Sequence, residues 1–169
     1  MWPNRLPRLK GFAYRGFHRY LVTAKAFRHA APFVDSAVAR ELATQISPYF
    51  AVNDFEVLAY CVMPDHVHLL LEGTSSSADL REGVRVWKQR TGYAWKQRTG
   101  SQLWQPGFHD HILREGDDTR MVVRYVLQNP VRAGLVQSAG DYPWIGSSRY
   151  TVAELETHAG DWSTDWKRR

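Results

Sequence analysis

The hydrophobic and polar positions of this chain follow two different periods, and their alternation predicts strands and helices in a definite order. Runs rich in aromatic and β-branched residues predict β-strands at 18–27, 55–63, 66–73 and 107–115. Apolar residues three and four apart predict helices at 35–50, 77–97 and 117–130. The predicted order of elements is therefore β-α-β-β-α-β-α.

This order is typical of an α+β fold of the split βαβ, ferredoxin-like kind, with an antiparallel sheet and its helices on one face. Pro64 and Asp65 have the turn chemistry that a hairpin between the second and third strands requires. The helix at 117–130 is an addition at the C-terminal end of this unit. We expect the sheet face without helices to be available to a ligand.

The composition supports one globular domain with less regular ends. The chain has 169 residues, of which 44% are hydrophobic and 23% are charged. Residues 1–16 lack periodicity and are rich in Pro, Arg and Gly, which predicts a basic N-terminal arm. We expect the domain to span 17–136 and a tail at 137–169 to pack on it and fray at its end.

The ends and the apolar runs also bear on localisation. The N-terminus lacks the apolar core of a signal peptide, and no apolar run approaches membrane-spanning length. Cys61 is the single cysteine, which excludes an intrachain disulfide and a cysteine-rich zinc site. These features predict a cytoplasmic protein without a membrane partner.

The charge balance favours a polyanionic partner. Lys and Arg number 22 against 17 Asp and Glu, which gives a net charge of +5. Basic surfaces gain affinity for nucleic acid by displacing counterions from phosphates. Aromatic residues stand beside basic ones in "VWKQR" and "YAWKQR", as suits single-stranded nucleic acid. An ordinary basic protein with an aromatic core explains the same composition equally well.

The segment "MPDHVHLLLEG" places two histidines on one face of the third predicted strand. His66 and His68 are two residues apart, so their side chains point the same way, while Val67, Leu69 and Leu71 point the other way. The apolar set suits the core, so we expect the histidines on the opposite, accessible face. Two neutral imidazoles placed in this way converge on a metal ion. The alternative is a pair of polar residues on a solvated sheet face.

The segment "RYVLQNP" supplies a second candidate pair. Tyr125 and Asn129 are four residues apart and share a helix face. Asn129 precedes Pro130, so we expect it at the end of the helix, with its amide oxygen free to coordinate a hard divalent cation. A core tyrosine followed by a capping asparagine explains this pair better when it is taken alone.

Taken together, these motifs resemble a known family. "HVH" after "MPD", "LWQPGFHDHILR", "YVLQNPVRAGLV" and "YPWIGSSRY" occur in this order along the chain. In this they resemble the single-tyrosine HUH transposases, in particular the REP-associated tyrosine transposases. The resemblance extends over about residues 17–150, and several ordered motifs are more specific than any one of them.

The resemblance implies a transposase that nicks single-stranded DNA, often beside a hairpin, and rejoins strands through a 5′-phosphotyrosine. By motif position it makes Tyr125 the nucleophile, and His66, His68 and Asn129 the ligands of Mg²⁺ or Mn²⁺. Related proteins often have glutamine at the last position, and Asn129 is preferred to Gln128 because it keeps the four-residue spacing. Relatives work as monomers or as homodimers, and both states stay open here.

Further residues are expected to activate Tyr125 or to contact DNA. The phenol of Tyr125 needs activation, because an unperturbed tyrosine has a pKa of about 10. The candidates are His109, Asp110 and His111. "WKQRTG" occurs twice with an eight-residue offset, which keeps its basic residues on one helical face. The expected DNA contacts, each also explicable as a solvated charge, are Arg5, Arg8, Lys10, Arg15, Lys88, Arg90, Lys96, Arg98 and Arg132.

Two other functions compete with strand transfer. A non-catalytic single-stranded nucleic-acid-binding module has the same order of elements, but it carries an aromatic signature on its central strands where this chain has His66 and His68. A metal-dependent phosphoesterase would use activated water, and Tyr125 would then be structural.

Overall fold

The computed structural model describes residues 11–160, with the backbone alone for 158–160. Within this range the strands form one sheet in the order β4-β1-β3-β2-β5, with neighbours antiparallel. The strands are β1 (Arg19–Lys25), β2 (Phe55–Met63), β3 (His66–Gly73), β4 (His109–Leu113) and β5 (Ile145–Gly146). The helices are α1 (Ser36–Ala51), α2 (Leu80–Thr99), α3 (Thr119–Arg132) and α4 (Val152–Gly160).

The α+β class and the predicted order of elements up to α3 are confirmed. β1 and β2 are joined through α1, but β3 lies between them in the sheet, so two βαβ units interleave. Three short 3₁₀ turns, Phe27–His29, Pro32–Val34 and Ala139–Asp141, complete the connections. The tyrosine helix α3 is not the last element, because β5 and α4 follow it.

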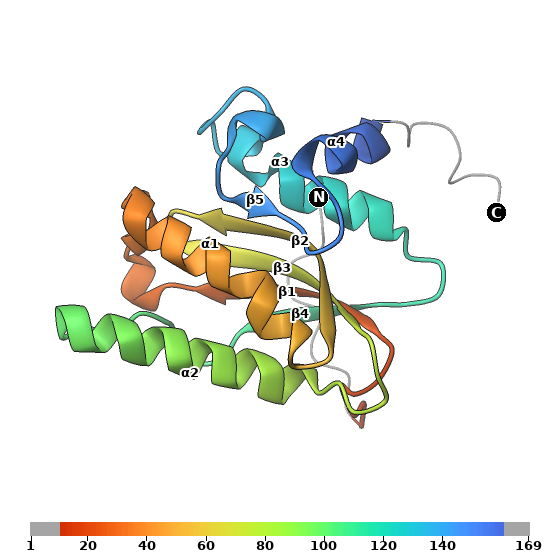
Figure 1. Ribbon diagram of the computed structural model, residues 1–169, viewed down its shortest axis with the longest axis horizontal. Coiled ribbons are helices and arrows are strands. Elements are labelled where there is room, and N and C mark those ends of the chain that lie inside the picture. Colours follow the sequence, from red (N-terminus) through yellow and green to blue (C-terminus); the bar gives the residue numbers. More distant parts are fainter. Residues whose placement is uncertain (1–10, 161–169) are drawn as a thin grey trace.

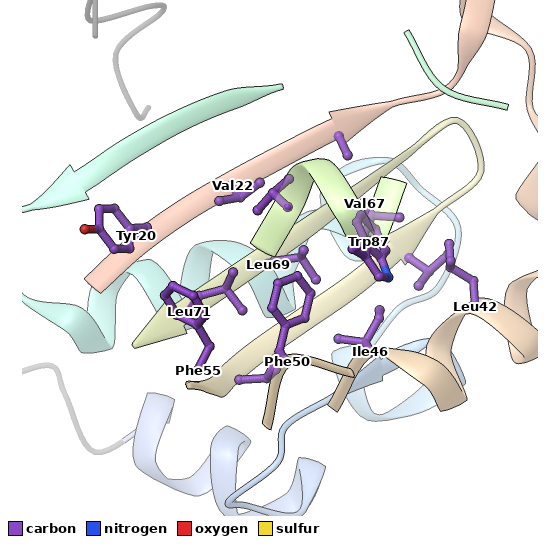
Figure 2. Packing of buried hydrophobic residues seen from close by; sticks show 14 of the residues in the cluster. Tyr20, Val22, Leu42, Ile46, Phe50, Phe55, Val67, Leu69, Leu71 and Trp87 are labelled. Atoms are coloured by element: carbon purple, nitrogen blue, oxygen red, sulfur yellow. The ribbon is translucent and has the colours of Figure 1, made fainter. Parts of the chain in front are cut away.

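Helices cover both faces of the sheet. Figure 1 shows α1 and α2 on one side of the strands, and α3 with α4 on the other. On the first side, Val22 and Leu69 pack against Ile46 and Phe50 of α1 and Trp87 of α2, as Figure 2 shows. This side is the apolar core that the alternation of β3 predicted.

The second side holds a core of its own. Leu21 and Leu70 of the sheet pack with Val122 and Val126 of α3 and with Leu155 of α4. Each fully buried side chain of this kind contributes about 2 kcal/mol relative to exposure. The expectation that the second face is open is therefore wrong, because the apolar stripe of α3 needs a partner and finds it there.

Aspartate side chains begin the three main helices. The Asp35 carboxylate accepts hydrogen bonds from the backbone N–H groups of Ala37 and Val38 at the start of α1. Asp79 and Asp118 do the same at the starts of α2 and α3. Each cap contributes roughly 1 kcal/mol by satisfying amides that have no partner within the helix. The prediction of a helix from Ser77 placed the start of α2 three residues too early.

The described residues of the predicted arm, 11–16, pack on the domain. Tyr14 is 1% exposed and stacks on Tyr20, and Arg15 forms an ion pair with Asp79. Residues 1–10 of the arm lie outside the described residues. None of the helices within 11–160 has the length and apolar character needed to cross a bilayer.

Candidate active site

The register of three strands gathers polar side chains on the face that α3 covers. His68 of β3 lies opposite Thr23 of β1, and Thr23 lies opposite His109 of β4. Directly opposed residues in an antiparallel pair share a face, so these three side chains form a row across the sheet. His66 lies one step along β3, opposite Lys25.

The two histidines of β3 turn the same ring nitrogen toward each other. Nε2 of His66 is 3.1 Å from Nε2 of His68. Nδ1 of His66 is 2.6 Å from Oδ1 of Asp65, and Nδ1 of His68 is 2.9 Å from Oγ1 of Thr23. A carboxylate only accepts hydrogen bonds, so Nδ1 of His66 carries the proton and Nε2 keeps its lone pair. The Thr23 hydroxyl can donate to or accept from Nδ1 of His68, according to the tautomer of that ring.

Burial distinguishes the two histidines. His68 is 5% exposed because α3 lies over it, whereas the side chain of His66 keeps 22% exposure. Burial, and next the neighbouring His66, lower the pKa of His68 to about 3. His68 is therefore neutral at physiological pH, which is the form that ligates metals. The expectation of two accessible histidines holds for His66 and is wrong for His68.

α3 brings Tyr125 and Asn129 to the same place. The ring of Tyr125 lies edge to face with that of His68, with centroids 5.6 Å apart. The Asn129 side chain hydrogen bonds to His68, and its Nδ2 donates to the backbone carbonyl of Tyr125 at 2.7 Å. This hydrogen bond raises the pKa of His68, as an acceptor does, so the amide oxygen is the atom turned to His68. The Arg132 guanidinium lies 5.4 Å from the centroid of the Tyr125 ring.

The helix does not end at Asn129 as expected. α3 continues through Pro130 to Arg132, and Pro130 is buried. A proline so close to the end of a helix removes a single backbone hydrogen bond, and its burial against the sheet offsets the loss. Asn129 is therefore held on the helix face beside Tyr125, at the spacing that the sequence indicated.

The donors present fit a divalent cation. Two nitrogens that bind one ion at about 2.1 Å and at a right angle are about 3 Å apart, close to the separation of the two Nε2 atoms. Asp65 and Thr23 orient the rings from behind, as partners of metal-binding histidines usually do. Within residues 11–160 no group of three His, Cys, Asp or Glu side chains is suited to a metal, so the third donor would be the Asn129 amide oxygen.

The three residues considered for activating Tyr125 lie on two different faces of the sheet. His109 and His111 lie opposite Thr23 and Leu21, on the side of His68, and Nε2 of His111 is 3.8 Å from Oδ2 of Asp117. Asp110 lies opposite Val22 and points to the other side of the sheet. The expectation for Asp110 is therefore wrong.

Gln128 was the alternative to Asn129 as the third donor. It is half-buried on α3, and among the described contacts it makes none with His66 or His68, whereas Asn129 contacts His68. The arrangement in space therefore agrees with the preference for Asn129.

The basic residues of α2 lie on the side of the sheet away from His66 and His68 (Figure 1). Lys88 donates to the carbonyls of Gln105 and Gly107, and burial lowers its pKa to about 8. Its expected role in DNA contact is wrong, because its ammonium group holds the segment before β4. Arg98 pairs with Glu41 at 2.5 Å, and Arg90 lies over the Tyr49 ring.

The remaining expected DNA contacts have different surroundings. Lys96 is exposed on α2, Arg15 pairs with Asp79, and Arg132 is the member of the set that lies at Tyr125. Arg5, Arg8 and Lys10 fall outside the described residues. The predicted basic face of α2 is thus not continuous with the candidate site.

Three residues of the site escaped the sequence analysis as site residues. Asp65 was assigned to a turn, although its position next to His66 is a signal for a hydrogen-bonded partner. Thr23 and Lys25 are polar residues two positions apart on β1. Only the pairing of β1 with β3 brings them close to the histidines.

Comparison with known proteins places the chain in a family. Residues 17–129 match the family model described as IS200-like transposase, a range that contains His66, His68, Tyr125 and Asn129. The REP-associated tyrosine transposase of Escherichia coli (strain K12) is 30% identical over 111 residues, which cover 66% of this chain and 64% of that protein. A Haemophilus influenzae protein, provisionally given the same name, is 27% identical over 121 residues, which cover 64% of this chain and 66% of that protein.

A solved structure supports the same relationship at the level of the fold. The chain matches a REP-associated tyrosine transposase bound to a REP hairpin with a TM-score of 0.65 and 23% identity. The match covers 83% of this chain and 82% of the other. The chain spans slightly less than two thirds of the two curated relatives, and its family model covers well over half of it. The chain belongs to the family of IS200-like transposases.

Proposed function

We propose that this protein nicks single-stranded DNA and transfers the strand through a 5′-phosphotyrosine at Tyr125. The observation that carries the proposal is the Tyr125 ring, 5.6 Å from the ring of His68, next to two Nε2 atoms that face each other at 3.1 Å. Membership of a transposase family supports DNA as the substrate. The related structure that holds a REP hairpin supports a hairpin near the cleaved bond.

The proposed reaction exchanges one phosphoester for another. The phenol oxygen of Tyr125 forms a bond to phosphorus, the bond from phosphorus to the 3′ oxygen breaks, and the 3′ oxygen takes up a proton from water to leave as a hydroxyl. The phenol proton passes to a base on the same side of the sheet, where His109 and His111 lie. Because one ester replaces another, a 3′-hydroxyl of a second strand can reverse the step without ATP.

The side chains around the site fix the orientation of the reacting groups. Asp65 and Thr23 fix the rings of His66 and His68, and the burial of α3 fixes the position of Tyr125. A divalent cation held by His66, His68 and Asn129 would offset the negative charge on the phosphate oxygens. These residues come together within one chain.

The test is the detection of a covalent adduct. The full chain is incubated with Mn²⁺ and a labelled pool of single-stranded DNA that carries a hairpin between randomised flanks, then denatured and separated. We expect a labelled protein band, and mass spectrometry of its peptides should find the nucleotide on Tyr125. Cleaved DNA without an adduct would indicate a phosphoesterase instead, and binding without cleavage would indicate a binding module.

A further inference from the structure

Lys25 stands beside the candidate site, although the motifs do not include it. It is the last residue of β1 and lies directly opposite His66 of β3. It shares its face with Thr23, two residues earlier, whose hydroxyl contacts His68. The Cβ atoms of directly opposed residues lie about 5 Å apart, so a lysine stem starting there passes the imidazoles.

The charge of Lys25 is not neutralised within the described residues. Lys25 is exposed, and none of the ion pairs within 11–160 includes it. Asp65, the carboxylate at this end of β3, is engaged with Nδ1 of His66. An uncompensated ammonium group therefore lies beside the site.

The other charges explain what this ammonium group can do. The Asn129 amide carries no charge, so it adds no positive charge of its own to the site. The Arg132 guanidinium lies over the ring of Tyr125, on the side of α3. Lys25 approaches from β1 beside His66, whereas Arg19, the other basic residue of β1 on this face, lies at the opposite end of the strand and pairs with Glu72.

We propose that the Lys25 ammonium group binds a non-bridging oxygen of the phosphate that Tyr125 attacks. The assignment rests on the proposed function for the position of that phosphate. Negative charge on the phosphate oxygens is the main obstacle to attack by an oxygen nucleophile, and a fixed cation reduces it. Lys25 would thus touch the substrate, where Asp65 and Thr23 act through the histidines.

The first experiment measures DNA binding without catalysis. Affinity for the hairpin-bearing DNA pool is measured against salt concentration in the Tyr125→Phe background. A lysine bound to a phosphate of single-stranded DNA adds about 0.7 to the slope of log affinity against log salt. We expect Lys25→Gln to remove about this amount of slope, and the matched Arg40→Gln, an exposed position on α1, to leave it unchanged. An unchanged slope in Lys25→Gln overturns the proposal.

The second experiment measures the rate of adduct formation at saturating DNA. We expect Lys25→Gln to slow it at least about tenfold, because a charge-assisted contact to the phosphate is lost, and Lys25→Arg to recover part of the rate. A wild-type adduct with an unaffected rate in Lys25→Gln overturns this proposal and leaves the proposed function intact. Absence of any wild-type adduct overturns the proposed function, and the salt slope then decides alone whether Lys25 contacts phosphate. Equal melting temperatures of the variants confirm folding.

Discussion

The two faces of the sheet are built from the same strands, but one holds only an apolar core and the other also holds the candidate site. The face under α1 and α2 is filled by apolar side chains, with Leu69 packed among aromatic residues. The face under α3 is apolar around Leu70 and polar around His68, two residues away on the same strand. One helix therefore has to bury its valines and present Tyr125 and Asn129 within four turns. The geometry of the candidate site therefore depends on the packing of the apolar side chains of α3, which interleave with Tyr125 and Asn129 along the helix.

The largest effect is expected at the nucleophile. Tyr125→Phe should reduce adduct formation by roughly four orders of magnitude, because no other group replaces the attacking oxygen. Stability should change little, since the ring and its contact with His68 remain. Tyr93→Phe, at an exposed tyrosine on α2, is the control for the far face and should keep full activity. An adduct that persists in Tyr125→Phe would remove Tyr125 from the mechanism.

The next effect concerns the histidine pair. His66→Ala should weaken Mn²⁺ binding more than about 100-fold, since loss of a ligand exceeds the 10- to 100-fold cost of losing a supporting hydrogen bond. Isothermal titration calorimetry measures this without any DNA. Single-stranded DNA affinity without metal should be nearly unchanged. His18→Ala serves as the control, because His18 precedes β1, whose far end pairs with His66. Equal Mn²⁺ affinity in the two variants would argue against the pair.

A smaller effect is expected behind the metal site. Asp65→Asn keeps the shape but no longer fixes which ring nitrogen of His66 carries the proton. We expect Mn²⁺ affinity to fall roughly 10- to 100-fold, with melting temperature nearly unchanged because Asp65 is partly exposed. Asp141→Asn, at an exposed aspartate of the turn before β5, should show no change. A neutral result for Asp65→Asn would mean that the hydrogen bond does not orient the ring.

The two faces can be compared directly through neighbouring leucines. Leu69 and Leu70 are both fully buried and point to opposite faces. Each change to alanine should cost about 2–5 kcal/mol of unfolding free energy, measured by urea denaturation. Only Leu70→Ala should also slow adduct formation, by a few fold at a temperature where both variants are folded, because it loosens the packing of α3. Equal activity losses would contradict a functional difference between the faces.

The sequence predicted the elements well because local patterns determine them. β2 and β3 have the predicted bounds, and α1 lies within one residue of the predicted helix at each end. The position of α3 over His68 could not be predicted, because the sequence pattern of an amphipathic helix does not determine which face of the sheet the helix covers. The same limit applies to Thr23 and Lys25, which reach the histidines only through the register of β1 with β3. Pro130 misled the prediction because its tertiary burial outweighs a local preference.

The order of the strands has a further consequence for association between copies of the protein. β5 pairs with β2 at one end of the sheet, so among the described strands β4 is the longer of the two edges. A free edge invites another strand to add to it, and aggregation often begins in this way. β4 is five residues long and carries His109, Asp110 and His111 in succession. Short polar edges of this kind disfavour edge-to-edge growth, so the residues that flank the candidate site also help to keep the sheet finite.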